Sequence, residues 1–224
     1  MSLPAPACLL FDLDGTLLDT AGDMGRSLNQ LRREQDLPPL PLATIRPWVS
    51  QGSAGMLKVG FDLQPDQPAF ETLRQRFLEL YAGDLCRDTV LFPQMARVLE
   101  HLEAQKLPWG VVTNKPGWLT DPLLGQLGLF QRATCVVSGD TTPRRKPHPD
   151  PLLYAARLAG VRPEACWYVG DAQRDIEAGR RAGMTTLAAC FGYILAHERP
   201  ALWGADRLLE DAGQLLALLA QTRP

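Results

Sequence analysis

Residues 7–16 read ACLLFDLDGT, a short apolar run followed by two aspartates and a glycine. Five consecutive apolar residues have the length of a strand that is buried on both faces, and Gly15 favours a tight turn directly after it. Strands of this kind occur mainly in parallel sheets that are covered by helices. The stretch therefore predicts the first strand of an α/β domain, with Asp12 and Asp14 at its carboxyl end.

The rest of the chain repeats this pattern and alternates it with helical spacing. Further apolar runs lie at residues 109–112, 134–137, 166–169 and 185–190. Stretches with apolar residues three and four apart separate these runs, and leucines at 215–219 indicate a last helix that docks on the sheet. The alternation predicts right-handed βαβ units, and hence a doubly wound, Rossmann-like parallel sheet with helices on both faces.

One region interrupts the alternation. Residues 20–88 contain no convincing strand, but Leu28 with Leu31, and later the apolar positions from Phe70 to Tyr81, have helical spacing. We therefore expect a helical insert over residues 20–88, with its own apolar core, and an α/β core formed by residues 1–19 and 89–224.

Composition excludes several classes of protein. The chain has 224 residues, with 23 Lys and Arg against 25 Asp and Glu, so no basic excess favours nucleic acid or an anionic membrane. We find no apolar run of membrane-spanning length and no secretory signal. The five cysteines form no C-x-x-C pair, which indicates reduced thiols. We expect a cytoplasmic protein, monomeric or homodimeric, without a nucleic-acid or membrane partner.

Polar residues follow the predicted strands. Because ligands of open α/β sheets bind at the carboxyl ends of the strands, we expect these residues to converge there. Crowded carboxylates need a cation, and an oxygen-only ligand set without Cys or His favours Mg²⁺, which commonly shares its shell with a substrate phosphate. The residues therefore predict a magnesium site for a phosphorylated ligand; they are Asp12, Asp14, Thr113, Asn114, Asp140, Asp171 and Asp175.

Four ordered segments then become recognisable. FDLDGT at 11–16, VTN at 112–114, KP at 146–147 and GDAQRD at 170–175 resemble the motifs of the haloacid-dehalogenase-like (HAD) hydrolase superfamily. The resemblance covers essentially the whole chain, and the insert resembles the helical C1-type cap of that superfamily. It implies a phosphoryl-transfer enzyme, because Asp14 stands where related dehalogenases lack an acid–base aspartate.

The resemblance implies catalytic roles for these residues. Asp12 is expected to attack phosphorus and form an aspartyl-phosphate, while Asp14, carrying a proton, serves as general acid and then base. Lys146 is expected to neutralise the developing charge. Gly15, Thr113 and Asn114 are expected to bind the phosphoryl oxygens, through backbone N–H groups at the Gly15 turn and through side-chain donors at the other two.

It also implies the metal ligands. Mg²⁺ is expected to bind Asp12, the backbone carbonyl of Asp14, and Asp171. Asp175 is expected to be a further ligand or to hold one, since at i and i+4 of a new helix it would share a face with Asp171.

The resemblance implies that the substrate is a small phosphorylated metabolite. The overall pattern resembles phosphoglycolate phosphatases. The stretches 109–116, 191–194 and 203–206 are closer to the N-acetylmuramic acid 6-phosphate phosphatases of cell-wall recycling, although the loop at 191–194 is equally consistent with a surface aromatic. Those proteins are expected to carry an arginine where this chain has Ala54, a charge that Arg46 or Lys58 could supply.

Other functions stay open at this point. A hexose-phosphate mutase needs the same motifs, a phosphonate hydrolase would need Lys58 as an imine former, and a binding protein could have kept the fold without catalysis. In the insert, the loop 49–55 is expected to face the core site, with Ser50 and Gly52 binding substrate and Gly52 and Gly55 allowing close approach of the backbone. Hinges are expected at Asp19-Thr20 and Arg87-Asp88.

Overall fold

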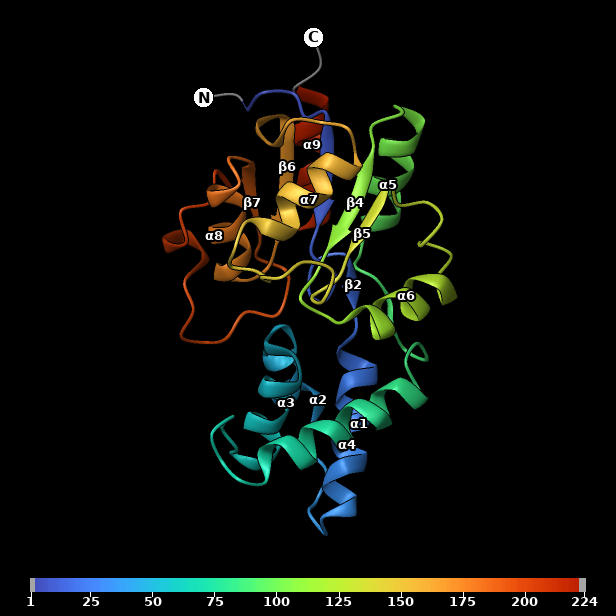
Figure 1. Ribbon diagram of the computed structural model, residues 1–224, viewed down its shortest axis with the longest axis vertical. Helices are drawn as coiled ribbons and strands as arrows, with labels where there is room; N and C mark the ends of the chain where they lie inside the picture. The colour runs from blue at the N-terminus through green and yellow to red at the C-terminus, as the bar shows by residue number, and fades with distance from the viewer. Residues whose placement is uncertain (1–2, 222–224) are drawn as a thin grey trace.

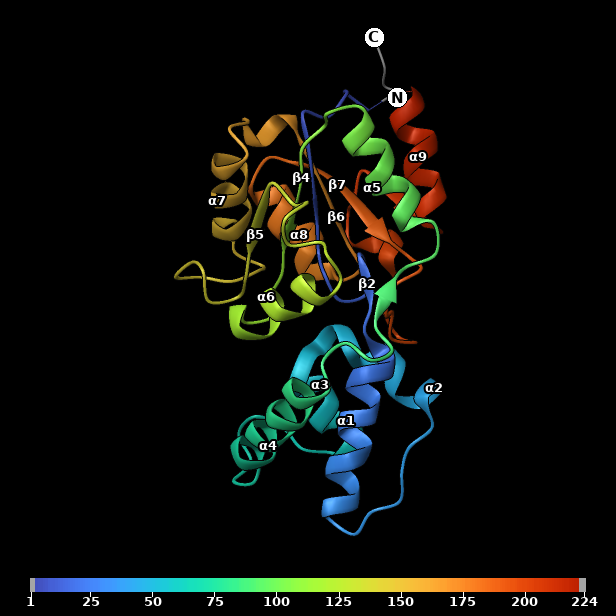
Figure 2. The ribbon, with the colours of Figure 1, turned by 90° about the vertical axis from the view of Figure 1, so that its right-hand side faces the viewer.

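The computed structural model describes residues 3–221 and has two lobes, an α/β lobe and a helical lobe (Figures 1 and 2). The α/β lobe is built on one six-stranded sheet in which every strand pair is parallel. This confirms the predicted fold class. Residues 1, 2 and 222–224 of the expected core lie outside the described residues. The strands, in spatial order, are β5 (Cys135–Val137), β4 (Trp109–Val112), β1 (Cys8–Phe11), β6 (Cys166–Gly170), β7 (Thr185–Ala189) and β8 (Arg207–Leu209).

The central position of β1 determines where a ligand can bind. Leu9 pairs with Trp109 of β4 on one side and with Trp167 of β6 on the other. The chain therefore winds away from β1 in both directions, which leaves a crevice at the carboxyl end of this strand. Asp12 follows β1 directly and lies at that crevice.

Helices cover both faces of the sheet. Alternate residues of β1 point to opposite sides, so that Leu9 and Phe11 belong to one hydrophobic cluster and Cys8 and Leu10 to another. The first cluster includes side chains from α5 (Met95–Ala104), α6 (Gly117–Gln126) and the predicted last helix α9 (Ala212–Gln221). The second includes side chains from α7 (Asp150–Leu158) and α8 (Gln173–Arg181).

Three short strands were not predicted from the sequence. β8 has three residues, of which only Leu209 is buried, and it lies at the edge of the sheet. β2 (Leu18–Asp19) and β3 (Val90–Leu91) have two residues each and pair antiparallel where the chain leaves and re-enters the α/β lobe. Strands this short cannot display an alternating pattern, so periodicity does not detect them.

The helical lobe contains no strand between residues 20 and 88, as predicted. The two expected helices are present as α1 (Ala21–Glu34) and α4 (Phe70–Gly83), whereas α2 (Leu42–Ile45), the 3-10 helix η1 (Arg46–Gln51) and α3 (Gly52–Phe61) were not predicted. Leu28, Leu57 and Phe77 are fully buried. Among residues 3–221, no helix combines the length and apolar character needed to cross a membrane.

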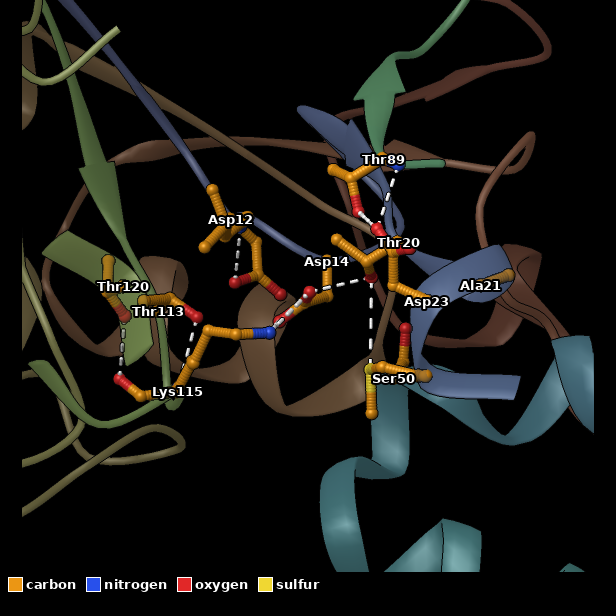
Figure 3. Close-up of polar contacts among 12 residues, drawn as sticks. Asp12, Asp14, Thr20, Ala21, Asp23, Ser50, Thr89, Thr113, Lys115 and Thr120 are labelled. Atoms are coloured by element: carbon orange, nitrogen blue, oxygen red, sulfur yellow. Dashed lines mark hydrogen bonds and ion pairs between the residues drawn. The ribbon is translucent and has the colours of Figure 1, made fainter. Parts of the chain in front are cut away.

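Asp23, in the first turn of α1, joins the two segments that connect the lobes. Its buried carboxylate accepts the backbone N–H groups of Asp88 and Thr89, both at 2.9 Å. It also accepts the Thr89 hydroxyl at 2.5 Å, and Figure 3 shows both contacts with Thr89. It also contacts Arg26. Burial by itself would raise the pKa of Asp23, but these hydrogen bonds and Arg26 lower it overall.

Asp23→Asn is expected to lower the free energy of unfolding by about 2 kcal/mol at pH 7, because an amide cannot accept all of these donors. A carboxyl whose pKa is lowered by folding stabilises the protein above its unfolded pKa, and this stability is lost as the pH falls through the folded value. The difference in unfolding free energy between the wild type and Asp23→Asn should therefore become smaller below about pH 4. Urea unfolding at pH 7 and pH 3 measures it. Asp84→Asn, at a half-exposed partner of Arg26, should cost about 0.5 kcal/mol or less. Equal deficits of Asp23→Asn at both pH values would contradict the expectation.

Candidate active site

Asp12 and Lys146 form a buried ion pair at the end of β1. The Asp12 Oδ1 atom lies 2.8 Å from Lys146 Nζ and accepts the Leu13 N–H at 2.7 Å. Lys146 Nζ also lies 2.8 Å from Asp175 Oδ1 and donates to the Val112 carbonyl and the Tyr168 hydroxyl. The side chain of Lys146 is fully buried, so water screens little of the attraction between its ammonium group and the carboxylates of Asp12 and Asp175.

Asp12, Asp171 and Asp175 form a compact acidic cluster. Each offers a carboxylate oxygen, and these oxygens lie within 4.8 Å of one another. Burial together with repulsion from Asp175 raises the pKa of Asp12 to about 6, and burial with repulsion from Asp12 raises the pKa of Asp171 well above its usual value. Asp171 Oδ1 is buried without a hydrogen-bond partner. A divalent cation would satisfy this oxygen and offset the excess negative charge, so the residues fit a hard metal ion.

Asp175 reaches the cluster differently from the way the sequence suggested. Helix α8 begins at Gln173, so Asp171 lies in the preceding turn and does not share a helical face with Asp175. The expected i, i+4 arrangement is therefore wrong, because residues 171 and 172 complete a turn after β6. Asp175 Oδ2 instead accepts the Ala172 N–H at 3.0 Å, while its Oδ1 faces Lys146. Burial would raise the pKa of Asp175, but Lys146 and Arg174 hold it below its usual value.

Asp14 is bound by a lysine that sequence analysis missed. Lys115 Nζ lies 2.8 and 2.9 Å from the two oxygens of Asp14, and the Thr20 hydroxyl donates to the Asp14 Oδ1 atom at 2.7 Å (Figure 3). Lys115 Nζ also lies 4.9 Å from the centre of the Tyr81 ring. Burial by itself would lower the pKa of Lys115, but the charge of Asp14 raises it overall. Both oxygens of Asp14 thus contact the Lys115 ammonium group, a partner that was not predicted from the sequence. Lys115 follows the VTN motif directly, which is the signal that could have found it.

The expected phosphoryl-binding residues lie at the same edge, but they have structural partners. Gly15 has φ +87°, and a Cβ atom there would lie 1.9 Å from Asp171 Oδ2, so glycine is required at this turn. The Thr113 hydroxyl accepts the Lys115 N–H at 3.1 Å. The Asn114 side chain bridges to the backbone of Lys146, at 3.0 Å to the carbonyl and 3.1 Å to the N–H.

Asp140, which the sequence grouped with the other strand-end carboxylates, accepts the N–H of Gly117 at 2.9 Å. It thereby satisfies the first backbone donor of α6 and is not part of the compact acidic cluster defined above. Asp140 therefore caps the amino end of α6 in this structure.

A cleft of about 850 Å³ lies between the lobes, and Asp12, Asp14 and Lys146 line its wall on the α/β lobe. Both lobes line it. Asp12, Asp14, Thr113, Asn114, Lys115, Lys146 and Arg174 come from the α/β lobe, and Ser50, Gly52, Ser53, Arg74 and Tyr81 come from the helical lobe.

The helical lobe contacts the acidic cluster through Ser50. The Ser50 hydroxyl donates to Asp171 Oδ2 at 2.5 Å, and its carbonyl accepts Arg174 at 2.5 Å. Gly52 lines the cleft with φ +61°. Gly55 does not serve close approach to a substrate, because a Cβ there would lie 2.4 Å from the Trp48 carbonyl within the lobe itself.

Two cations considered for the cleft lie elsewhere. Among the described residues that line the cleft, neither Arg46 nor Lys58 is present. Arg46 forms two hydrogen bonds with Asp19, at 2.9 and 2.8 Å, and Lys58 pairs with Asp62 on the surface. The positive charges of the cleft come instead from Lys115, Lys146, Arg74, Arg145 and Arg174.

Tyr193 is buried, so the interpretation of the loop 191–194 as a surface aromatic is wrong. Its hydroxyl accepts the N–H groups of Thr20 and Ala21, at 2.7 and 3.0 Å, and donates to Asp19 at 2.8 Å. Its backbone N–H donates to Asp171 Oδ2 at 2.8 Å. The loop therefore connects the acidic cluster to the segment that enters the helical lobe.

Comparisons with known proteins agree with this architecture. Residues 9–189 match the family model of haloacid dehalogenase-like hydrolases. The chain is 46% identical to a phosphoglycolate phosphatase of Xanthomonas campestris pv. campestris, over 98% of this chain and 99% of the relative. It is 40% identical to an N-acetylmuramic acid 6-phosphate phosphatase of Pseudomonas putida, over 92% of this chain and 93% of the relative.

A solved structure supports the same assignment. The crystal structure of a predicted phosphoglycolate phosphatase from Haemophilus somnus is 28% identical and has a TM-score of 0.82, covering 95% of this chain and 97% of that one. A family match over most of the chain, these full-length relatives and the strand-end acidic cluster all agree. The chain belongs to the haloacid dehalogenase-like hydrolase family, as an enzyme related to its phosphatases.

Proposed function

We propose that the protein is a Mg²⁺-dependent phosphomonoester hydrolase that acts on a small phosphorylated metabolite through an aspartyl-phosphate on Asp12. The observation that carries the proposal is the pairing of Asp12 with Lys146, at 2.8 Å, inside an acidic cluster in which Asp171 Oδ1 has no protein partner. A nucleophilic carboxylate, a fixed cation and ligands for a divalent metal are the parts that phosphoryl transfer requires.

In this proposal Asp12 reacts first, and Asp14 then transfers protons. Lys146 and the Leu13 N–H hold Asp12 by one oxygen, which orients the carboxylate for attack on phosphorus. An oxygen–phosphorus bond forms to Asp12, and the bond to the leaving oxygen breaks. Asp14 gives a proton to that oxygen and later takes one from the water that hydrolyses the acyl phosphate.

The magnesium site is part of the same proposal. A bound Mg²⁺ would supply positive charge beside the phosphoryl oxygens. Asp12, Asp171 and the Asp14 carbonyl would hold it. Asp175 has hydrogen bonds or ion pairs at both oxygens, so in this proposal it orients Lys146 and the turn before α8. Gly15, Thr113 and Asn114 shape the phosphoryl pocket.

We further propose that residues 20–88 form a cap over a core of residues 1–19 and 89–224, with hinges at Asp19-Thr20 and Arg87-Asp88. Ser50 and Gly52 reach the cleft from this cap. Closure of the cap would exclude water and bring cap side chains into contact with the leaving group, so that they select the substrate. A cytoplasmic location is supported by the five free cysteines. Absence of a nucleic-acid partner, and a monomeric or homodimeric state, stay predictions.

Phosphoglycolate is the preferred substrate of the proposal, because the relative at 46% identity is named for it. N-acetylmuramic acid 6-phosphate is the second candidate, because a relative at 40% identity is named for that activity and a cleft of about 850 Å³ has room for a sugar. The hexose-phosphate mutase and the non-catalytic binding protein are outcomes of the test below.

Purified protein is expected to release phosphate from phosphoglycolate only when Mg²⁺ is present, and EDTA should abolish the activity. The experiment measures kcat/KM for phosphoglycolate, N-acetylmuramic acid 6-phosphate, hexose phosphates and nucleotides. A hundredfold preference corresponds to about 2.7 kcal/mol of discrimination in the transition state. Metal-independent release would contradict the metal site. If no phosphate were released from any compound, the non-catalytic binding protein would be favoured. Isomerisation of a hexose phosphate without release of phosphate would favour the mutase.

A further inference from the structure

Asp171 is the point where the helical lobe meets the acidic cluster. Its Oδ2 atom accepts two hydrogen bonds, from the Ser50 hydroxyl at 2.5 Å and from the Tyr193 N–H at 2.8 Å. Its Oδ1 atom is buried and has no partner. With both donors on one oxygen, the carboxylate is held in one orientation, and Oδ1 is the oxygen left for a cation.

Ser50 is itself held in place from the α/β lobe. Arg174, in the first turn of α8 between Asp171 and Asp175, donates to the Ser50 carbonyl at 2.5 Å. Ser50 therefore makes two short contacts across the cleft, one through its hydroxyl and one through its backbone. Both contacts require the 3-10 helix η1 to be docked against the cluster.

Tyr193 provides a second connection between Asp171 and the helical lobe. Its N–H holds the Oδ2 atom, while its hydroxyl is bonded to Asp19, Thr20 and Ala21 in the segment that enters the helical lobe. Arg46, which follows in the helical lobe, pairs with Asp19 and lies 5.1 Å from the centre of the Tyr193 ring. The position of the helical lobe is thus linked to Asp171 Oδ2 through two donors, the Ser50 hydroxyl and the Tyr193 N–H.

We propose that Ser50 is a positioning residue for the metal ligand Asp171, so that docking of residues 46–55 and binding of the cation strengthen each other. The inference rests on the magnesium site of the proposed function. Hydrogen bonds to the free side of a ligand orient it and raise metal affinity. Because linkage is reciprocal, an undocked lobe binds the metal more weakly, and the metal in turn favours the docked lobe.

The first test compares Ser50→Ala with Ser53→Ala, a second serine of the same cleft wall. Titration calorimetry with Mg²⁺ alone, without substrate, is expected to show about tenfold weaker binding for Ser50→Ala. Ser53→Ala should bind like the wild type, and Ser50→Thr, which keeps a hydroxyl, should recover most of the affinity. Equal affinity of Ser50→Ala and the wild type would overturn the inference while leaving the proposed function intact.

The second test uses hydrogen exchange, and its first arm uses the wild-type protein alone. Mg²⁺ is expected to slow exchange in residues 46–55 of the wild type, and this protection should be absent in Ser50→Ala at saturating metal. Exchange in that segment that does not respond to Mg²⁺ in the wild type would overturn the coupling. Failure of the wild type to bind Mg²⁺ in the calorimeter would overturn the metal site of the proposed function together with this inference.

Discussion

Replacing Asp12 by asparagine is expected to lower kcat for phosphate release by at least about a thousandfold, because the amide is not a nucleophile. The fold should persist. Asparagine keeps an oxygen that can accept the Leu13 N–H and Lys146 Nζ. Steady-state kinetics with Mg²⁺ and thermal unfolding of the same preparation measure both effects.

The stability expectation for this variant has a definite sign. Burial and the neighbouring Asp175 raise the pKa of Asp12 to about 6 in the metal-free protein. A carboxyl whose pKa is raised by folding binds more protons in the folded state, so its ionisation lowers stability as the pH rises from about 4 through about 6, and the loss is complete at higher pH. A neutral amide removes this penalty, and the melting temperature at pH 7.5 without Mg²⁺ should not fall.

Asp140→Asn is the matched control, since the sequence alone grouped Asp140 with Asp12. Its carboxylate caps α6 through the Gly117 N–H, and asparagine can accept the same hydrogen bond. Activity should stay within about threefold of the wild type. If Asp12→Asn retained normal turnover, or if Asp140→Asn lost as much activity as Asp12→Asn, the assignment of Asp12 as nucleophile would be wrong.

Lys146→Met is expected to lower the free energy of unfolding by about 3 kcal/mol or more at pH 7.5 without Mg²⁺, and to abolish measurable turnover. The methionine fills a similar volume but leaves Asp12 and Asp175, both 2.8 Å from the lost ammonium group, without its charge inside the protein. Chemical denaturation and phosphate-release assays measure the two effects.

The destabilisation by Lys146→Met should depend on pH. Burial would raise the pKa of Asp175, and Lys146 with Arg174 lowers it below its usual value. A lowered pKa stabilises the fold above the unfolded value and ceases to do so as the pH falls through the folded one. The deficit should therefore be full at neutral pH and narrow below about pH 4.

Lys58→Met provides the control for the loss of a lysine. Lys58 pairs with the exposed Asp62 outside the cleft, and loss of such a surface pair costs little. Stability and activity are both expected to stay near wild type, which would also exclude Lys58 as an imine former. If Lys146→Met left stability and activity unchanged while Lys58→Met abolished activity, the roles assigned to the two lysines would be wrong.

Local sequence patterns were sufficient for the fold class and for all three members of the acidic cluster. Apolar runs of four to six residues with polar ends indicate buried parallel strands, and such strands bring their carboxyl ends to one edge. Asp12, Asp171 and Asp175 were therefore grouped from the sequence, and the structure brings their oxygens within 4.8 Å. The helical insert was also recognisable, because α1 and α4 are long enough to display helical periodicity.

Packing of the whole molecule decided which partner each polar group has. Lys115 reaches Asp14 across 101 residues of sequence, Ser50 reaches Asp171 across 121, and Tyr193 reaches Asp19 across 174. Periodicity specifies the face on which a side chain lies, but a hydrogen bond also needs two atoms within about 3 Å and correctly oriented. For Lys115 and Tyr193 that condition depends on how the α/β lobe packs, and for Ser50 it depends on how the helical lobe docks on the α/β lobe. It also separates Asp140, which caps α6, from Asp171, whose free oxygen faces no protein donor.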